Sequence, residues 1–181
     1  MHRILLIFVF GIFSLSTLAQ NKIKEGTFGV ALNSSINGEI YLFQFTPSFI
    51  YAKGKNQLEL GVGFNPTNRQ SQKLLNADFN YRYYPNERGQ KYNLFFVSNL
   101  SYLKRSINSF YPAQYNYFFL NGGYGLEVKP LEKLYLSTSV SAGTFTFNKR
   151  SETQHEAFIS QDLFDEFGFV VSFQFSVGFR F

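Results

Sequence analysis

The 181-residue sequence predicts an all-β fold, an eight-stranded antiparallel up-and-down barrel. Apolar residues alternate with polar or small ones along most of the chain, and no stretch shows the period of a helix. Turn residues divide this alternation into eight runs. The composition, 45% hydrophobic and 20% aromatic with only 16% charged, excludes a disordered chain.

The first nineteen residues have the pattern of a secretory signal peptide. Arg3 supplies a positive charge, Ile4 to Phe13 form an apolar stretch, and Thr17 and Ala19 occupy the small-residue positions before a cleavage site. The stretch is shorter than the roughly 20 residues that a membrane-spanning helix needs. We therefore expect residues 1–19 to be removed and residues 20–181 to form one barrel domain.

Each of the eight runs has one apolar face, and the first is the shortest. In chain order these faces extend from Phe28 to Leu32, Tyr41 to Tyr51, Leu58 to Phe64, Leu75 to Tyr83, Tyr92 to Tyr102, Phe118 to Val128, Leu134 to Ala142 and Phe167 to Phe181. The first run is predicted to end at a turn formed by residues 34–38. Because the number of strands is even, both ends of the chain lie on the same side.

Short and long connections alternate between the later runs. Short turns follow the second, fourth and sixth runs, whereas polar loops at residues 65–73, 104–114 and 148–166 follow the third, fifth and seventh. Transmembrane barrels have short periplasmic turns and long outer loops. The pattern therefore predicts a transmembrane barrel with both termini in the periplasm, although a soluble sandwich or lipocalin-like barrel would show the same alternation.

Strand charges and glycines favour the transmembrane alternative. Nearly all strand glycines lie on the polar face, where they leave room in a narrow interior. The charged strand residues also lie opposite the apolar stripe, as a lipid-facing stripe requires. These residues are Glu59, Asp78, Arg82, Glu127 and Arg180.

These features resemble the small eight-stranded outer-membrane barrels of Gram-negative bacteria, of the OmpX, OmpA-barrel and OmpW kind. The last strand is similar to that family's assembly signal, through Phe173, Phe175, Val177, Phe179 and the terminal Phe181. The resemblance implies export to the outer membrane, contact with its lipid and lipopolysaccharide, and recognition by the barrel-assembly machinery. Two departures are the absence of Trp and the position of Pro47 within a strand, where we expect a bulge or a strand end.

The basic character of the chain does not indicate nucleic-acid binding. The sequence has a formal net charge of +5, but its excess positive charge falls mainly in the short turns, which would face anionic lipid heads. The inward charges allow three interpretations: solvated groups at an open mouth, a paired structural plug, or a gate.

The chain offers little that suggests catalysis, a metal or a cofactor. The absence of Cys excludes zinc-thiolate, disulfide and Cys-nucleophile chemistry. His155 lies near Ser151, Glu152 and Glu156 in the last loop, but no strand supplies a matching nucleophile. Asp162, Asp165 and Glu166 lack the spacing of a calcium loop. We expect no catalytic residue, metal or cofactor.

Three functions remain open. The first is a non-enzymatic barrel with a structural or surface-interaction role, acting through loop aromatics among polar residues. These aromatics are Phe110, Tyr111, Tyr115, Phe158 and Phe164. The second is a narrow channel or carrier for small or apolar solutes, suggested by the inward-facing Leu42, Ile50, Phe95, Val97 and Val170. The third is a lipid-modifying enzyme that uses His155.

Overall fold

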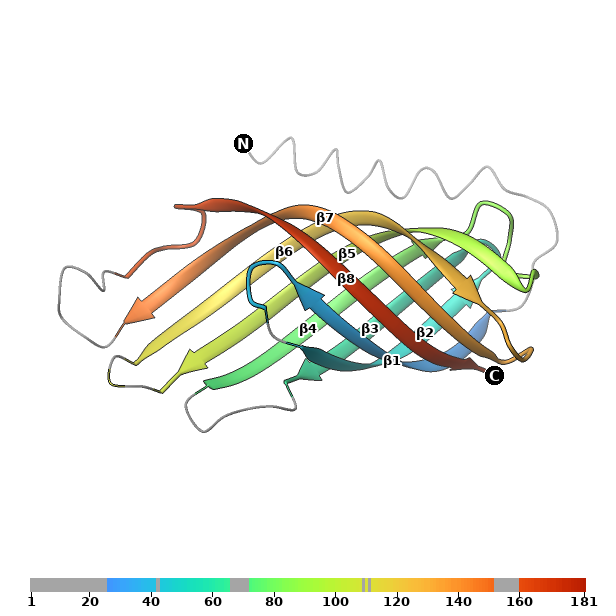
Figure 1. Cartoon of the computed structure of the whole chain (residues 1–181), viewed down its shortest axis with the longest axis horizontal. Coiled ribbons are helices and arrows are strands. Elements are labelled where there is room, and N and C mark those ends of the chain that lie inside the picture. The colour runs from blue at the N-terminus through green and yellow to red at the C-terminus, as the bar shows by residue number, and fades with distance from the viewer. Residues whose placement is uncertain (1–25, 42, 66–71, 109, 111, 152–159) are drawn as a thin grey trace.

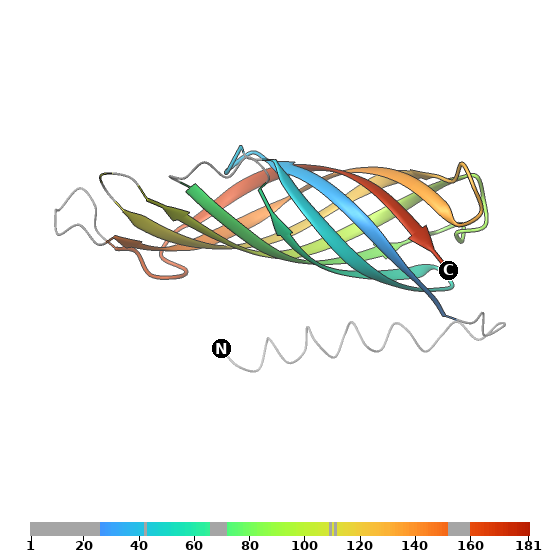
Figure 2. The ribbon, with the colours of Figure 1, turned by 90° about the horizontal axis from the view of Figure 1, so that it is seen from below.

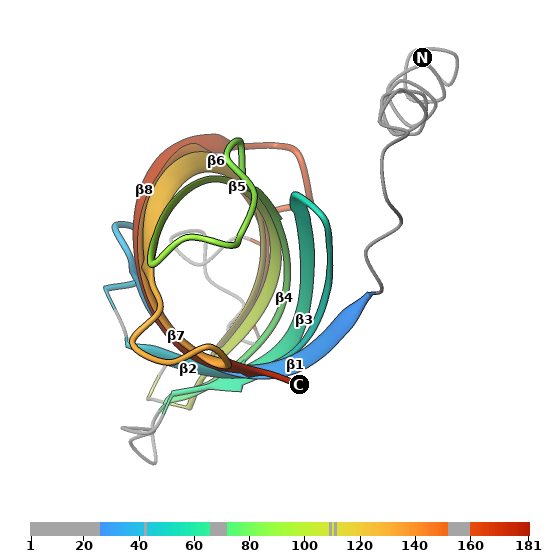
Figure 3. The ribbon, with the colours of Figure 1, turned by 90° about the vertical axis from the view of Figure 1, so that its right-hand side faces the viewer.

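The structure, a computed structural model, is an antiparallel sheet of eight strands that closes on itself (Figures 1 and 3). It describes residues 26–41, 43–65, 72–108, 110, 112–151 and 160–181. The strands are β1 (Thr27–Asn37), β2 (Gln44–Lys53), β3 (Asn56–Phe64), β4 (Gln72–Tyr83), β5 (Tyr92–Ile107), β6 (Ala113–Val128), β7 (Leu134–Ser151) and β8 (Phe167–Arg180). Each strand pairs with the next, and β1 pairs with β8 to close the barrel. The predicted all-β barrel is confirmed.

The barrel has two different ends. At the turn end, β1 begins, β8 ends, and residues 54–55, 84–91 and 129–133 join β2 to β3, β4 to β5 and β6 to β7 (Figure 1). The predicted alternation of short turns with longer loops holds only in part, because the β4–β5 connection is longer than the β5–β6 connection at residues 108–112. At the opposite loop end, the wall is uneven, because β5, β6 and β7 have 16, 16 and 18 residues whereas β3 has 9. The three long strands project beyond their neighbours (Figure 2).

Four predicted loop boundaries differ in the structure. β4 begins at Gln72, within the segment 65–73. β1 continues to Asn37, so the turn predicted at residues 34–38 begins later. β5 and β6 extend into the segment 104–114, and β7 runs to Ser151 within the segment 148–166. These boundaries were wrong because polar residues there still alternate with inward-facing ones, and that alternation continues the strand.

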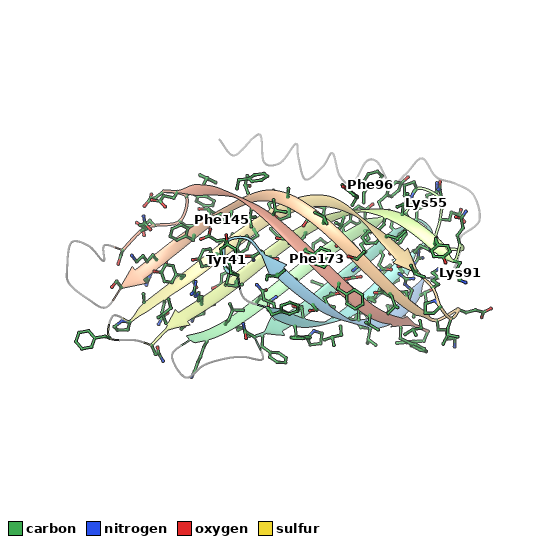
Figure 4. The ribbon with its side chains drawn as sticks, viewed as in Figure 1. Tyr41, Lys55, Lys91, Phe96, Phe145 and Phe173 are labelled. Atoms are coloured by element: carbon green, nitrogen blue, oxygen red, sulfur yellow. The ribbon has the colours of Figure 1, made fainter. Side chains whose placement is uncertain are left out.

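The side chains divide between the two faces of the wall as the alternation predicted. Apolar residues cover the exterior, and Phe96 and Phe173 are examples (Figure 4). The alternate residues Phe173, Phe175, Val177 and Phe179 of β8 all face outward. The interior holds mostly polar and aromatic side chains. In the described part of the chain, no helix has the length and apolar character needed to cross a membrane.

Pro47 interrupts one ladder without shifting its register. It pairs with Leu32 of β1, but β2 and β3 pair only at Phe45 with Phe64 and from Ser48 with Gly61 onward. The register is the same on both sides of the gap, so the predicted bulge or strand end was wrong. Proline has no N–H to donate, and the pairing is lost only toward β3.

Candidate functional site

The barrel interior near the turn end is filled by two ion pairs. Nε of Arg82 lies 3.2 Å from Oε1 of Glu59, and Nη2 of Arg180 lies 2.6 Å from Oε2 of Glu127. All four side chains are buried. Glu59 and Arg82 come from the paired strands β3 and β4, whereas Arg180 reaches Glu127 across β7.

Hydrogen bonds extend these pairs to most of the wall. Arg82 donates to Oγ of Ser137 at 2.8 Å and to Oγ of Ser176 at 3.1 Å. Arg180 donates to Oε1 of Gln57 at 2.5 Å. The network therefore ties together strands that are not neighbours in the barrel. Both guanidinium groups have hydrogen-bond partners through their terminal nitrogens, whereas Nε of Arg82 and Nε of Arg180 are buried without one.

Aromatic rings complete this layer. The guanidinium carbon of Arg180 lies 4.0 Å from the centroid of the Tyr135 ring, and that of Arg82 lies 4.8 Å from the Phe95 ring. Tyr84, which follows β4, donates to Oε2 of Glu127 at 2.8 Å. Burial raises the pKa of Tyr84, so its hydroxyl keeps the proton that it donates. We call this layer the ionic plug: Gln57, Glu59, Arg82, Tyr84, Phe95, Glu127, Tyr135, Ser137, Ser176 and Arg180.

Asp78, the fifth predicted interior charge, lies apart from the ionic plug. Its Oδ2 accepts hydrogen bonds from Nδ2 of Asn76 at 2.7 Å and from Oγ1 of Thr46 at 3.2 Å. Further along the interior, Asn99 donates to Asn80 at 2.8 Å. The middle of the barrel is thus a neutral amide and hydroxyl layer around one carboxylate.

The loop end of the interior holds an apolar layer that the sequence reasoning largely missed. We call it the aromatic plug: Ile40, Leu74, Leu103, Tyr115, Tyr117, Phe119, Phe145, Phe147 and Val170. The rings of Tyr117 and Phe119 stack at 5.8 Å, and Phe119 and Phe145 lie 5.7 Å apart. The signal was available, since Leu103, Tyr117 and Phe119 continue the inward positions of β5 and β6. It was hidden because Phe118 and Leu120 make both faces of β6 apolar beside Phe119, whereas the polar outward residues beside Leu103 and Tyr115 resemble a loop.

Two charged groups accompany the aromatic plug. Glu39 lies between β1 and β2, and Arg105 is an inward position of β5 rather than a loop residue. Burial raises the pKa of Glu39, and the charge of Arg105 partly opposes that shift. The described structure therefore places a carboxyl and a guanidinium at the rim of the apolar layer.

The structure places the candidate residues of the loops in different environments. His155, Glu152, Glu156, Leu42, Tyr111 and Phe158 lie outside the described residues. Phe110 and Phe164 are exposed. Tyr115 belongs to β6 and packs inside on Tyr117 at 5.9 Å, so its assignment to an outer loop was wrong. β6 begins earlier than predicted, and this places Tyr115 in the strand.

The acidic residues of the last loop accept hydrogen bonds from other residues of the same loop. Oδ2 of Asp165 accepts from the backbone N–H of Asp162 at 2.9 Å, and Oε1 of Glu166 accepts from Gln161 at 2.9 Å. Among the residues that the structure describes, no group of three or more His, Asp or Glu side chains is arranged to hold a metal ion.

No protein-family model matches the sequence, and the search of curated proteins finds no significant relative. Solved structures do match. The N-terminal barrel domain of Pseudomonas aeruginosa OprF has a TM-score of 0.60 at 14% identity, covering 87% of this chain and 100% of that one. A major outer membrane protein from Thermus thermophilus gives 0.53 at 13%, covering 87% and 100%. Neisserial surface protein A gives 0.51 at 11%, covering 86% and 96%.

These likenesses concern the fold. At such low identity they confirm the predicted resemblance to small outer-membrane barrels at the level of architecture, and they assign no activity.

Proposed function

We propose that the chain is an exported, non-enzymatic barrel of a Gram-negative outer membrane, with its turn end and termini in the periplasm. In this proposal it is an occluded structural barrel that presents its projecting loop end to partners outside the cell. The apolar exterior supports the membrane placement, because residues such as Leu60 and Phe169 are more than 60% exposed without lipid.

The single observation that carries the occluded state is the double plug. Arg82, Tyr84, Phe95, Glu59 and Glu127 are almost inaccessible at the turn end, although they point into the barrel. A separate layer, the aromatic plug, closes the loop end. An eight-stranded barrel has an interior just wide enough for side chains to fill, so two filled layers favour a solid interior over a channel.

The first experiment tests the barrel itself. Protein folded in detergent is run on a gel with and without boiling, alongside circular dichroism. A closed membrane barrel keeps a β spectrum and changes mobility on heating. A protein that is soluble without detergent and shows no mobility change would contradict the membrane placement. N-terminal sequencing of exported protein should find Gln20 first if the predicted leader is removed.

The second experiment separates an occluded barrel from a channel. In planar bilayers we expect the protein to show no sustained conductance, and Arg82→Ala to leave it closed, because the aromatic plug remains intact. A gate, in contrast, predicts that Arg82→Ala or Arg180→Ala raises single-channel conductance. Stable openings in the wild-type protein, or swelling of liposomes in small solutes, would favour the channel or carrier.

The lipid-modifying enzyme is tested through its only candidate residue. Lipid A from cells that express the wild-type protein should have the same mass as lipid A from cells that express His155→Ala. A change of mass that depends on His155 would replace the structural role by an enzymatic one.

A further inference from the structure

The exterior of the barrel has an apolar groove, separate from the two plugs of the interior. It has a volume of about 600 Å³ and extends from Pro47 of β2 across β3, β4 and β5 to β6. Its lining includes the outward residues Leu60, Val62, Ala77, Leu100, Tyr102 and Phe118. Ala77 pairs with Val62 on one side and with Tyr102 on the other, so a small side chain lies between larger ones at the middle of the groove.

A polar, positively charged row crosses the same wall nearer the loop end. In register, Lys73 pairs with Ser106, Ser106 with Gln114, and Gln114 with Arg150. These positions have the outward parity of their strands, and Lys73, Gln114 and Arg150 are exposed. Adjacent strands lie about 4.8 Å apart, so the row is about 14 Å wide.

Lys104 lies between the row and the groove. It pairs with Asn116 and follows Tyr102 by two residues, which places it about 7 Å beyond the groove along β5. Tyr102 has its ring 5.0 Å from Phe118 and donates its hydroxyl to Asn116 at 2.9 Å. An aromatic ring with a polar tip is the residue expected where hydrocarbon meets head groups.

The cations of this wall face no carboxylate partner among the residues that the structure describes. Within the described part of the chain, neither Lys73, Lys104 nor Arg150 has an ion-pair partner. They are separated by hydroxyl and amide side chains, not by carboxylates. The surface therefore offers positive charge, sugar-compatible hydrogen-bonding groups and an apolar groove, in that order from the loop end toward the middle of the barrel.

We propose that this wall binds a phosphorylated, multiply acylated glycolipid of the lipid A type. Lys73, Lys104 and Arg150 contact its phosphates, Ser106, Gln114 and Asn116 contact its sugar, and one acyl chain lies in the groove beside Ala77. The inference rests on the proposed function, because it needs the loop end at the outer leaflet.

The width and the charge of the row favour this ligand. A single phosphate head group is too small to engage a row that crosses four strands, whereas a phosphorylated sugar head group extends along it. A second copy of the chain is disfavoured, because a two-fold axis along the barrel would place the cationic row against itself.

The test measures binding of purified hexa-acyl, diphosphorylated lipid A to the full detergent-folded chain by native mass spectrometry, with phosphatidylglycerol for comparison. We expect one lipid A to bind more tightly than phosphatidylglycerol, and Lys73→Gln with Lys104→Gln to weaken it about ten- to thirty-fold. The matched control, Lys53→Gln with Lys133→Gln, removes the same charge at the turn end and should leave binding unchanged.

The groove has its own pair of variants. Ala77→Phe fills the depression while keeping every cation, and it should weaken lipid A binding. Ala142→Phe adds the same ring to the outward face of β7 and should not. The proposal would be overturned if the two lysine double variants bound lipid A equally well, or if the two alanine variants did. It would also be overturned if the wild-type protein bound lipid A and phosphatidylglycerol with equal affinity.

An error in the proposed membrane placement can be distinguished from an error in the proposed lipid A site. The gel-mobility and circular dichroism measurements are made on the same samples. A water-soluble protein without a heat-dependent mobility change overturns the membrane placement and this inference together, whereas a folded membrane barrel without selective lipid A binding overturns this inference alone.

Discussion

Tyr135 of β7 occupies the space that the missing side chain of Gly178 leaves on β8. The two residues are register partners, and a Cβ atom on residue 178 would overlap the tyrosine ring. The ring lies under the guanidinium of Arg180, and its hydroxyl donates to Oε1 of Glu59 at 3.4 Å. The absence of one side chain thus makes room for a ring that contacts both ion pairs of the ionic plug.

Gly178→Ala should therefore destabilise the barrel. The added methyl group displaces Tyr135, and overpacking of this kind costs about 1 to 3 kcal/mol. The measurement is urea unfolding of the protein in detergent or lipid vesicles. Gly122→Ala is the control, because residue 122 faces open space and should have little effect. Equal stability of the two variants would show that Tyr135 moves aside freely.

Arg180→Met should be among the most destabilising substitutions at the turn end. It leaves Glu127 buried without its ion pair, and breaking a buried pair costs about 3 to 5 kcal/mol. The double variant Glu127→Gln with Arg180→Met removes the orphaned charge and should recover part of that free energy of unfolding. If the single and double variants unfold at the same urea concentration, the unpaired charge of Glu127 is not the cause of the destabilisation, and the prediction is wrong.

Pro47→Val should stabilise the β2–β3 ladder. The new N–H completes pairing with β3 where the proline interrupts it, and an unpaired backbone group is costly in lipid. Replacing proline also frees the unfolded chain, which lowers stability. We expect the net free energy of unfolding to rise by about 1 kcal/mol after this loss is subtracted. Hydrogen exchange gives the direct measurement: the amide of residue 47 should be protected. Rapid exchange there would mean that the gap has another cause.

Glu39→Gln should stabilise the protein at neutral pH and not in acid. Burial raises the pKa of this carboxyl from its usual 4.5, so the folded state binds the proton more tightly than the unfolded state. Stability from this group is therefore present below about pH 4.5 and is lost as the pH rises through the higher folded-state pKa. Urea unfolding at pH 4 and pH 7 checks this, and a benefit at pH 4 alone would contradict it.

Much of the architecture follows from local pattern. Alternation along β2 to β8 identifies the outward face, and the inward positions of Glu59, Arg82, Glu127 and Arg180 follow from the same parity. Strand ends were less predictable. Polar residues of β5, β6 and β7 beyond the apolar band resemble loop residues, yet they remain paired because their inward neighbours pack in the aromatic plug.

The sequence by itself determined the number of strands, their faces and the inward direction of Glu59, Asp78, Arg82, Glu127 and Arg180, because a β-strand places alternate residues on opposite sides. Only the tertiary structure decided which charges meet. Glu59 and Arg82 are partners within a hairpin, but Arg180 finds Glu127, 53 residues away, because closure of the wall brings β6 and β8 within reach across a narrow interior. The exterior groove likewise depends on register, which sets Ala77 between Val62 and Tyr102.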